Sequence, residues 1–158
     1  MSTQPGPEPK PRPRNPRLNH VAMSMPSEAL GEEGRAAITS FYEDVFGWKE
    51  YDILTQDQRR LVLRVHSDEQ FVFLIADDSP MSCPRMDHFG MSVGTLVEFE
   101  DLYRRVQAKA ASDSEVDVVP AEVENHYDVL KLHSFYVRYK LPLMVEVQHF
   151  EYAAPPPS

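Results

Sequence analysis

Apolar and polar residues follow the same order of patterns in two consecutive parts of the chain. Residues 18–25 alternate as in a β-strand, with His20 on the same face as two small residues. Residues 37–46 carry apolar side chains at helical spacing, and Gly47 follows as the expected C-cap. Strand-like runs then occur at residues 48–54, 60–66 and 71–76. The first part therefore predicts the order β-α-β-β-β.

The second part repeats this order. The motif of residues 18–25 returns at residues 86–93, where the His, the Met and the Ser recur in place. A helix and three strands are then predicted at residues 97–110, 116–123, 132–139 and 143–150. We interpret the chain as one unit written twice, which places His20 and His88 on equivalent opening strands. Two facing imidazoles form half of a metal site.

An acidic residue interrupts the apolar pattern of the last predicted strand. Alternation places Glu146 on the same face as Gln148. A carboxylate that faces a protein interior without a partner is costly or is forced into its neutral form. We therefore expect that Glu146 needs a cation, and that His20, His88 and Glu146 share a metal site.

Length and composition predict a single domain. The chain has 158 residues, enough for one sizeable core. We expect this domain at residues 18–151, with units at 18–77 and 86–150, between a disordered Pro-rich tail at 1–17 and a second tail at 152–158. No apolar run reaches membrane-spanning length, so we expect no membrane partner.

The charge distribution narrows the class of partner. The formal net charge is −9 at pH 7, and residues 1–17 are basic, so the rest of the chain is more acidic still. An acidic body repels phosphate backbones, and we expect no nucleic-acid partner. A lone Cys83 and the lack of an apolar export signal favour a cytoplasmic location and exclude an internal disulfide.

Four short motifs resemble those of the vicinal oxygen chelate superfamily, which includes glyoxalase I, extradiol dioxygenases, fosfomycin-resistance proteins and bleomycin-binding proteins. They are Asn19-His20-Val21, Phe46-Gly47-Trp48, Asp87-His88-Phe89 and Val145-Glu146-Val147. The resemblance implies an α+β fold in which two βαβββ units curl into an incomplete barrel around a divalent metal. It assigns His20, His88 and Glu146 as the metal ligands.

A further motif is similar to extradiol dioxygenases in particular. Ser134-Phe135-Tyr136 matches the Ser-Phe-Tyr that precedes their glutamate ligand, which implies that Tyr136 hydrogen-bonds a substrate oxygen. Two His and one carboxylate leave open positions for a bidentate substrate and O₂ on Fe(II), with Mn, Ni or Zn as other metals. We therefore expect a metal-dependent, dioxygenase-like enzyme that acts on a small oxygen-rich substrate.

Three features depart from the dioxygenase pattern. Residues 139–143 form an unusual turn before the last strand, and the chain has one module where most of these enzymes have two. At the place of their second-sphere His the chain has Gln70 and Phe71, with His66 several residues earlier. The alternative is a non-catalytic protein of the same fold that sequesters a small molecule such as an antibiotic.

Two other kinds of relative fit less well. Glyoxalase I places a carboxylate on the fourth strand, where residues 73–75 are apolar, so glyoxalase-type isomerisation is disfavoured. Fosfomycin-type thiol transferases need a basic cluster, for which we expect the candidates Arg64, Arg138 and Lys140 to face solvent.

The resemblance also implies a homodimer, formed edge to edge or by exchange of halves. If halves exchange, His20 and the ligands of the second unit come from different chains. The remaining histidines are interpreted as surface residues or as supports of the site: His66, His126, His133 and His149.

Overall fold

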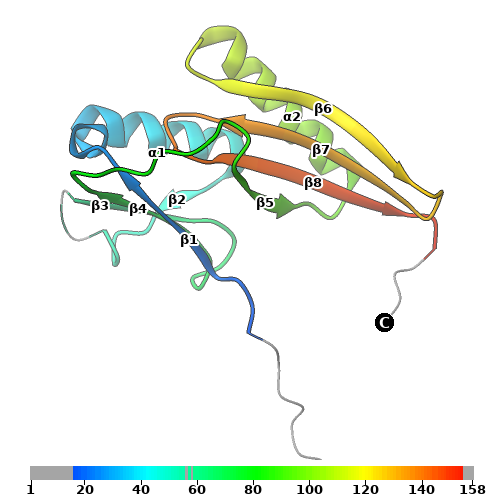
Figure 1. Ribbon diagram of the computed structural model, residues 1–158, viewed down its shortest axis with the longest axis horizontal. Coiled ribbons are helices and arrows are strands. Elements are labelled where there is room, and N and C mark those ends of the chain that lie inside the picture. Colours follow the sequence, from blue (N-terminus) through cyan, green and yellow to red (C-terminus); the bar gives the residue numbers. More distant parts are fainter. Residues whose placement is uncertain (1–15, 56, 58, 155–158) are drawn as a thin grey trace, which may run out of the picture.

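Two four-stranded sheets, one from each half of the chain, form the structure (Figure 1). It is a computed structural model, and it describes residues 16–154 except 56 and 58. In chain order the elements are β1 (His20–Met25), η1 (Ser27–Leu30), α1 (Glu32–Phe46), β2 (Lys49–Glu50), β3 (Arg60–Arg64), β4 (Phe71–Ala76), β5 (His88–Ser92), α2 (Leu96–Ser112), β6 (Asp117–His126), β7 (Leu130–Arg138) and β8 (Met144–Tyr152).

The order of elements is the same in both halves, as the sequence predicts. The first sheet has the strand order β1-β4-β3-β2, and the second sheet has the order β5-β8-β7-β6. In each sheet the opening strand pairs in parallel with the last strand of its unit, and the other pairs are antiparallel. The predicted α+β class and the two βαβββ units are therefore confirmed.

Polar residues at or near the N-terminus fix the start of both helices, and an apolar pattern does not reveal them. α1 begins at Glu32, before the predicted start at Ala37, because acidic side chains in its first turn favour the helix dipole. It ends at Phe46, and the C-cap Gly47 that follows has a left-handed φ of 73°, which suits glycine. α2 follows Thr95, which forms a capping box with Glu98. Within the described residues, no helix is long and apolar enough to span a membrane.

The second strand is much shorter than the sequence predicts. Alternation predicts a strand at residues 48–54, but β2 covers Lys49–Glu50 alone. The N–H groups of Leu54 and Thr55 both donate to the carbonyl of Tyr51, so the chain turns there instead of extending.

The predicted tails fall largely outside the described residues. Of the N-terminal tail at residues 1–17, only Pro16 and Arg17 are described. At the other end, β8 continues to Tyr152, which is the first residue of the predicted tail at 152–158. The last strand is therefore longer than the predicted run at 143–150.

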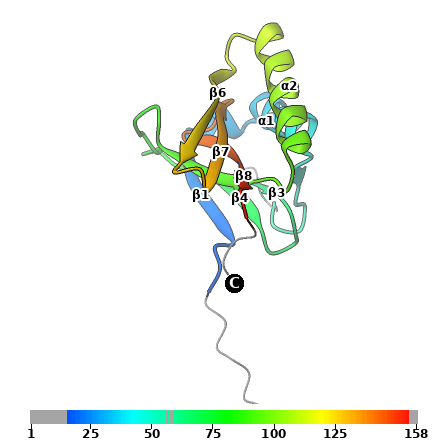
Figure 2. The ribbon, with the colours of Figure 1, turned by 90° about the vertical axis from the view of Figure 1, so that its right-hand side faces the viewer.

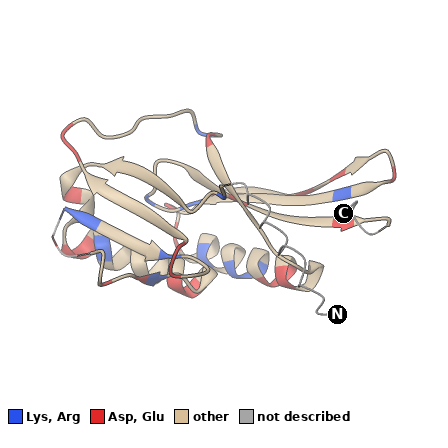
Figure 3. Cartoon of the chain, turned by 90° about the horizontal axis from the view of Figure 1, so that it is seen from below, with Lys and Arg blue, Asp and Glu red and all other residues tan. Residues whose placement is uncertain are grey.

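Each sheet has one face covered by a helix and one open face. Figures 2 and 3 show both helices on the same side of the sheets. Alternate residues on the covered faces are buried in one core: Met23, Met25, Leu61, Leu63, Val72, Leu74, Phe135, Val137, Val145 and Val147. The open faces carry exposed His20 and Ala22 on β1, and exposed His88, Gly90 and Ser92 on β5.

A buried tyrosine joins the two units. The Tyr42 hydroxyl on α1 donates to the carbonyl of Tyr139 and accepts from its N–H, each at 3.3 Å. Phe41 stacks on the Tyr139 ring with centroids 4.6 Å apart, and Trp48 stacks on Phe89 of β5. These contacts hold the two units together within one chain.

Candidate metal centre

His88 and Glu146 meet on the open face of the second sheet. Gly90 pairs with Glu146 across the parallel strands β5 and β8, and His88 shares the face of Gly90. His88 Nε2 is 3.4 Å from Glu146 Oε2. Two ligands that each lie about 2.1 Å from one divalent ion are about 3–3.5 Å apart, so this pair fits half of a metal site. A Cβ at Gly90 would lie 3.5 Å from the same oxygen, and the glycine leaves that space open.

The ring of His88 is oriented by its own backbone. Nδ1 is 2.7 Å from the carbonyl oxygen of Met86. Because a carbonyl only accepts, we assign the proton to Nδ1, which leaves the Nε2 lone pair free toward Glu146. Metal-binding imidazoles have this arrangement, in which the other ring nitrogen donates to a carbonyl or carboxylate.

Tyr136 lies beside the nearly buried Glu146, which is 7% exposed. The two residues pair across β7 and β8, and the Tyr136 ring stands edge-on to His88 at 5.1 Å. Hydrogen bonding to the Glu146 carboxylate, followed by burial, raises the pKa of the Tyr136 hydroxyl to about 12. Tyr136 therefore keeps its proton at neutral pH and acts as a hydrogen-bond donor at this site.

His20 is held differently, on the open face of the first sheet. Its ring stacks on Phe71 of β4, with centroids 4.9 Å apart and planes 9° from parallel. Its Nδ1 is 2.9 Å from the side-chain oxygen of Asn19, so Nε2 is the free nitrogen here too. His20 and Gly90 line the same small cavity between the two sheets.

The single chain brings His88, Glu146 and Tyr136 together but does not add His20. In the part of the chain that the structure describes, no three His, Cys, Asp or Glu side chains lie close enough to hold one metal ion. One chain therefore provides a ligand pair on the second sheet and a separate third candidate on the first.

The other histidines are occupied elsewhere or exposed. On the helix-covered face of the second sheet, His133 pairs with Glu151 at 3.0 Å, and His149 contacts the carbonyl of Val93. His66 is exposed in the loop between β3 and β4, and His126 is exposed at the end of β6.

The basic residues considered for a phosphonate site are each paired with a carboxylate. The pairs are Arg64 with Asp68, Arg138 with Asp117, and Lys140 with Glu115. These three cations lie in separate ion pairs, so they do not form the cluster that a phosphonate requires.

Sequence reasoning missed the groups that orient the two imidazoles. The Met86 carbonyl orients His88, and the Asn19 side chain orients His20. The two groups stand at different positions of the repeated motif, two residues before His88 and one residue before His20. The repeat alone therefore could not have identified them.

Comparison with known proteins identifies the fold. No family model matches the sequence, and no curated protein matches it. A fosfomycin resistance protein from Listeria monocytogenes superposes with a TM-score of 0.59 at 13% identity, over 86% of this chain and 92% of its own. A lactoylglutathione lyase from Agrobacterium tumefaciens superposes with a TM-score of 0.57 at 16% identity, over 86% of this chain and 95% of its own. A glyoxalase/bleomycin resistance protein/dioxygenase from Alicyclobacillus acidocaldarius superposes with a TM-score of 0.56 at 16% identity, over 89% of this chain and 96% of its own. The chain therefore has the fold of the vicinal oxygen chelate superfamily.

Proposed function

We propose that this protein is a metal-dependent enzyme that acts on a small oxygen-rich substrate by dioxygenase-like chemistry. His20, His88 and Glu146 would hold the metal, with Fe(II) favoured and Mn, Ni or Zn as alternatives. The observation that carries the proposal is an imidazole Nε2 that lies 3.4 Å from a carboxylate that is 7% exposed. A carboxylate buried to this extent needs positive charge beside it, which a divalent metal supplies.

The donor set determines which chemistry fits. Two imidazoles and one carboxylate leave open coordination positions, and a bound metal supplies a Lewis acid that lowers the pKa of adjacent substrate hydroxyls. The Tyr136 hydroxyl, protonated at neutral pH, donates to Glu146 in this structure. With metal and substrate bound it would donate instead to a substrate oxygen beside Glu146. The Met86 carbonyl keeps the His88 ring from rotating while substrate binds.

We further propose that His20 reaches this site from a second copy of the chain. Ala22 pairs with Phe73 in the first sheet as Gly90 pairs with Glu146 in the second. The position equivalent to Glu146 is thus a phenylalanine, and the strand beside His20 offers no carboxylate there. In a dimer with two-fold symmetry, the first sheet of each copy would face the second sheet of the other and form two equivalent sites.

Opposite charges on the two open faces support this pairing. Side chains of directly paired residues share a face of a sheet. By this register the open face of the first sheet carries Arg60 and Arg64. The open face of the second sheet carries Glu122, Glu124 and Glu146, together with Arg138, whose charge is paired with Asp117 at 2.9 Å.

The charges on the two open faces favour contact between the first sheet of one copy and the second sheet of the other. They oppose contact between two first sheets or two second sheets. Arg60 and Arg64 have local partners in the loop residues Asp57 and Asp68, at 3.6 and 3.0 Å. These exposed pairs contribute little and can exchange for partners on another copy.

Apolar walls favour a second candidate, a protein that binds a small molecule without turnover. The cavity beside His20 is lined largely by apolar side chains: Leu18, Val21, Val65, Phe71, Val72, Phe89 and Met91. A sequestering cleft needs such walls and does not need the His88–Glu146 pair. Its volume in one chain is about 90 Å³, so a small molecule would require the additional walls of a second copy.

Oxygen uptake separates the two candidates. Full-length protein is reconstituted with Fe(II) under anaerobic conditions and mixed with a panel of catechols, and O₂ consumption and ring-opened products are measured. The enzyme proposal predicts that O₂ uptake is lost in Glu146→Gln together with the metal. In Tyr136→Phe it predicts that O₂ uptake is strongly reduced although the metal stays bound. Binding of panel members to the metal-loaded protein without O₂ consumption would favour the sequestering protein.

A further inference from the structure

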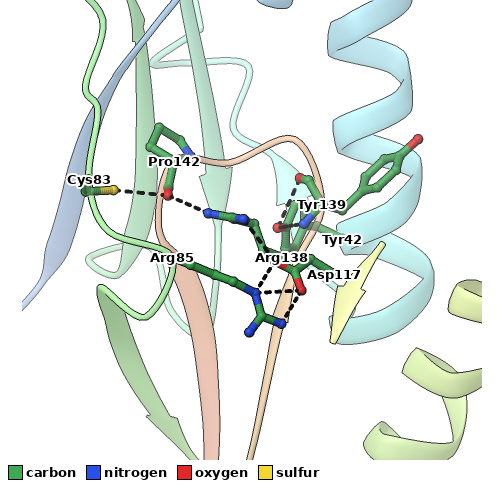
Figure 4. A network of polar contacts seen from close by, with 7 residues as sticks. All are labelled: Tyr42, Cys83, Arg85, Asp117, Arg138, Tyr139 and Pro142. Atoms are coloured by element: carbon green, nitrogen blue, oxygen red, sulfur yellow. Dashed lines mark hydrogen bonds and ion pairs between the residues drawn. The ribbon is translucent and has the colours of Figure 1, made fainter. Parts of the chain in front are cut away.

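An ion pair fixes the turn that precedes β5. Residues 84–87 form this turn, which is closed by the N–H of Asp87 donating to the carbonyl of Pro84 at 3.0 Å. Arg85 extends from the turn to Asp117 at the start of β6 (Figure 4). Its Nε is 3.0 Å from Oδ2, and its Nη2 is 2.6 Å from Oδ1, which makes the contact bidentate.

Asp117 also accepts from a second arginine and is thereby fixed in place. Arg138 Nη2 is 2.9 Å from Asp117 Oδ2, and Arg138 Nη1 contacts the carbonyl of Pro142. Hydrogen bonds from Arg85 lower the pKa of the Asp117 carboxyl, and the nearby positive charges of both arginines act in the same direction. Asp117 therefore stays ionised at neutral pH and remains a strong acceptor for Arg85.

The residue after Arg85 is Met86, whose carbonyl orients His88. Its oxygen accepts from His88 Nδ1 at 2.7 Å. If the turn rotated, the Met86 carbonyl would move away from Nδ1, and His88 would lose the acceptor that fixes its ring. A chain of contacts therefore connects Asp117, through Arg85 and the Met86 carbonyl, to the orientation of His88.

We infer that Arg85 and Asp117 are positioning residues for the His88 imidazole. Their ion pair holds the turn so that His88 carries its proton on Nδ1 and presents Nε2 to Glu146. The part of this inference that concerns metal affinity rests on the proposed function. The part that concerns the His88 tautomer does not, because it applies to the metal-free protein.

The first unit provides a matched comparison. Arg17 precedes His20 by the same spacing and pairs with Glu69. That pair is 74% and 70% exposed, whereas Arg85 and Asp117 are 53% and 26% exposed. His20 Nδ1 contacts the Asn19 side chain and not a carbonyl of the preceding turn. An exposed pair of this kind orders little, so the equivalent arginine in the first unit should have little effect on its histidine.

Nitrogen NMR of the histidine side chains in the metal-free full-length protein tests the inference. At a pH where the imidazoles are neutral, wild-type His88 should show the Nδ1–H tautomer. Arg85→Gln and Asp117→Asn should each convert His88 to a mixture of tautomers, while Arg17→Gln leaves His20 unchanged. Affinity for Mn(II), measured by titration, should fall about 10- to 100-fold in the two variants, as it does when an outer partner of a ligand is removed.

A conservative variant guards against simple loss of folding. R85K should give an intermediate effect on the His88 tautomer, because it keeps the charge but loses the bidentate contact. Wild-type His88 signals in Arg85→Gln would overturn the inference. A changed tautomer together with unchanged Mn(II) binding in His88→Ala would instead contradict the proposed metal site and leave the positioning role intact.

Discussion

His88 and Glu146 lie 3.4 Å apart, Nε2 to Oε2, whereas the equivalent pair in the first unit is a histidine and a phenylalanine. The two units therefore differ at one decisive position. The second unit has a carboxylate there, and Phe73 in the first unit cannot bind a cation. His20 has no carboxylate at that position in its own sheet, and under the proposed function it completes the site on the second sheet of another copy.

Complementation between two defective chains tests this assignment. We expect His20→Ala and Glu146→Gln to bind no metal when each is alone. In a mixed dimer the first chain supplies His88 and Glu146 while the second supplies His20, so about half of the sites are restored. Differently tagged chains are co-expressed, the mixed dimer is purified, and bound Mn(II) is counted. No bound metal in the mixed dimer would mean that each site is built within one chain.

Charge reversal tests how the two copies recognise each other. R60E/R64E and E122K/E124K each place like charges across the proposed contact, and each should raise the dimer dissociation constant at least about tenfold. A mixture of the two variants restores opposite charges on both contacts and should dimerise again. Sedimentation velocity measures the association, with Arg104→Glu on the outer side of α2 as control. If both variants dimerise as the wild type does, the open faces are not the contact.

Raised pKa values predict how stability changes in alkali. The pKa of Tyr136 is about 12 in the folded protein and about 10 when unfolded, so protonated Tyr136 stabilises the fold. This contribution is complete below pH 10 and is lost as the pH rises toward 12. Buried Tyr42 also has a raised pKa and adds a similar loss. The free energy of unfolding should therefore decrease less steeply between about pH 10 and 12 in Tyr136→Phe than in the wild type.

Removing one hydroxyl should weaken the joint between the units. Tyr42→Phe leaves the N–H and the carbonyl of Tyr139 without the bonds they make to that hydroxyl at 3.3 Å. Loss of partners for buried polar groups costs about 1–3 kcal/mol of unfolding free energy. Denaturant unfolding measures the change, with Tyr152→Phe on the more exposed end of β8 as control. Equal stability of the two variants would show that the Tyr42 hydroxyl does not hold the units together.

The sequence predicted the parts of the fold that depend on local pattern. Met23 and Met25 are buried while His20 is exposed, as alternation in β1 predicts, because one face of the sheet packs against a helix. The sequence placed His88 on the opening strand of the second unit and Glu146 on its last strand, and the structure pairs these two strands in parallel. The pairing itself was not predicted, because no local pattern shows which strands lie side by side.

The arrangement of the two units could not be predicted in the same way. It depends on contacts between distant residues, such as Phe41 with Tyr139, which no local periodicity encodes. The sequence predicted that His20 shares one site with His88 and Glu146. Among the described residues of one chain, His20 does not join the other two, because the placement of the two sheets depends on the same distant contacts. The turn that shortens β2 was missed because backbone hydrogen bonds to Tyr51, and not apolar spacing, determine it.

The metal content of the full-length protein tests the central claim most directly. Protein purified without chelator and then reconstituted should bind about one equivalent of Fe(II) or Mn(II) per chain. His88→Ala and Glu146→Gln should weaken this binding by more than about 100-fold, while His66→Ala, outside the site, should not change it. Less than about one-third of an equivalent in the wild type, with no gain on reconstitution, would contradict a metal centre at His88 and Glu146.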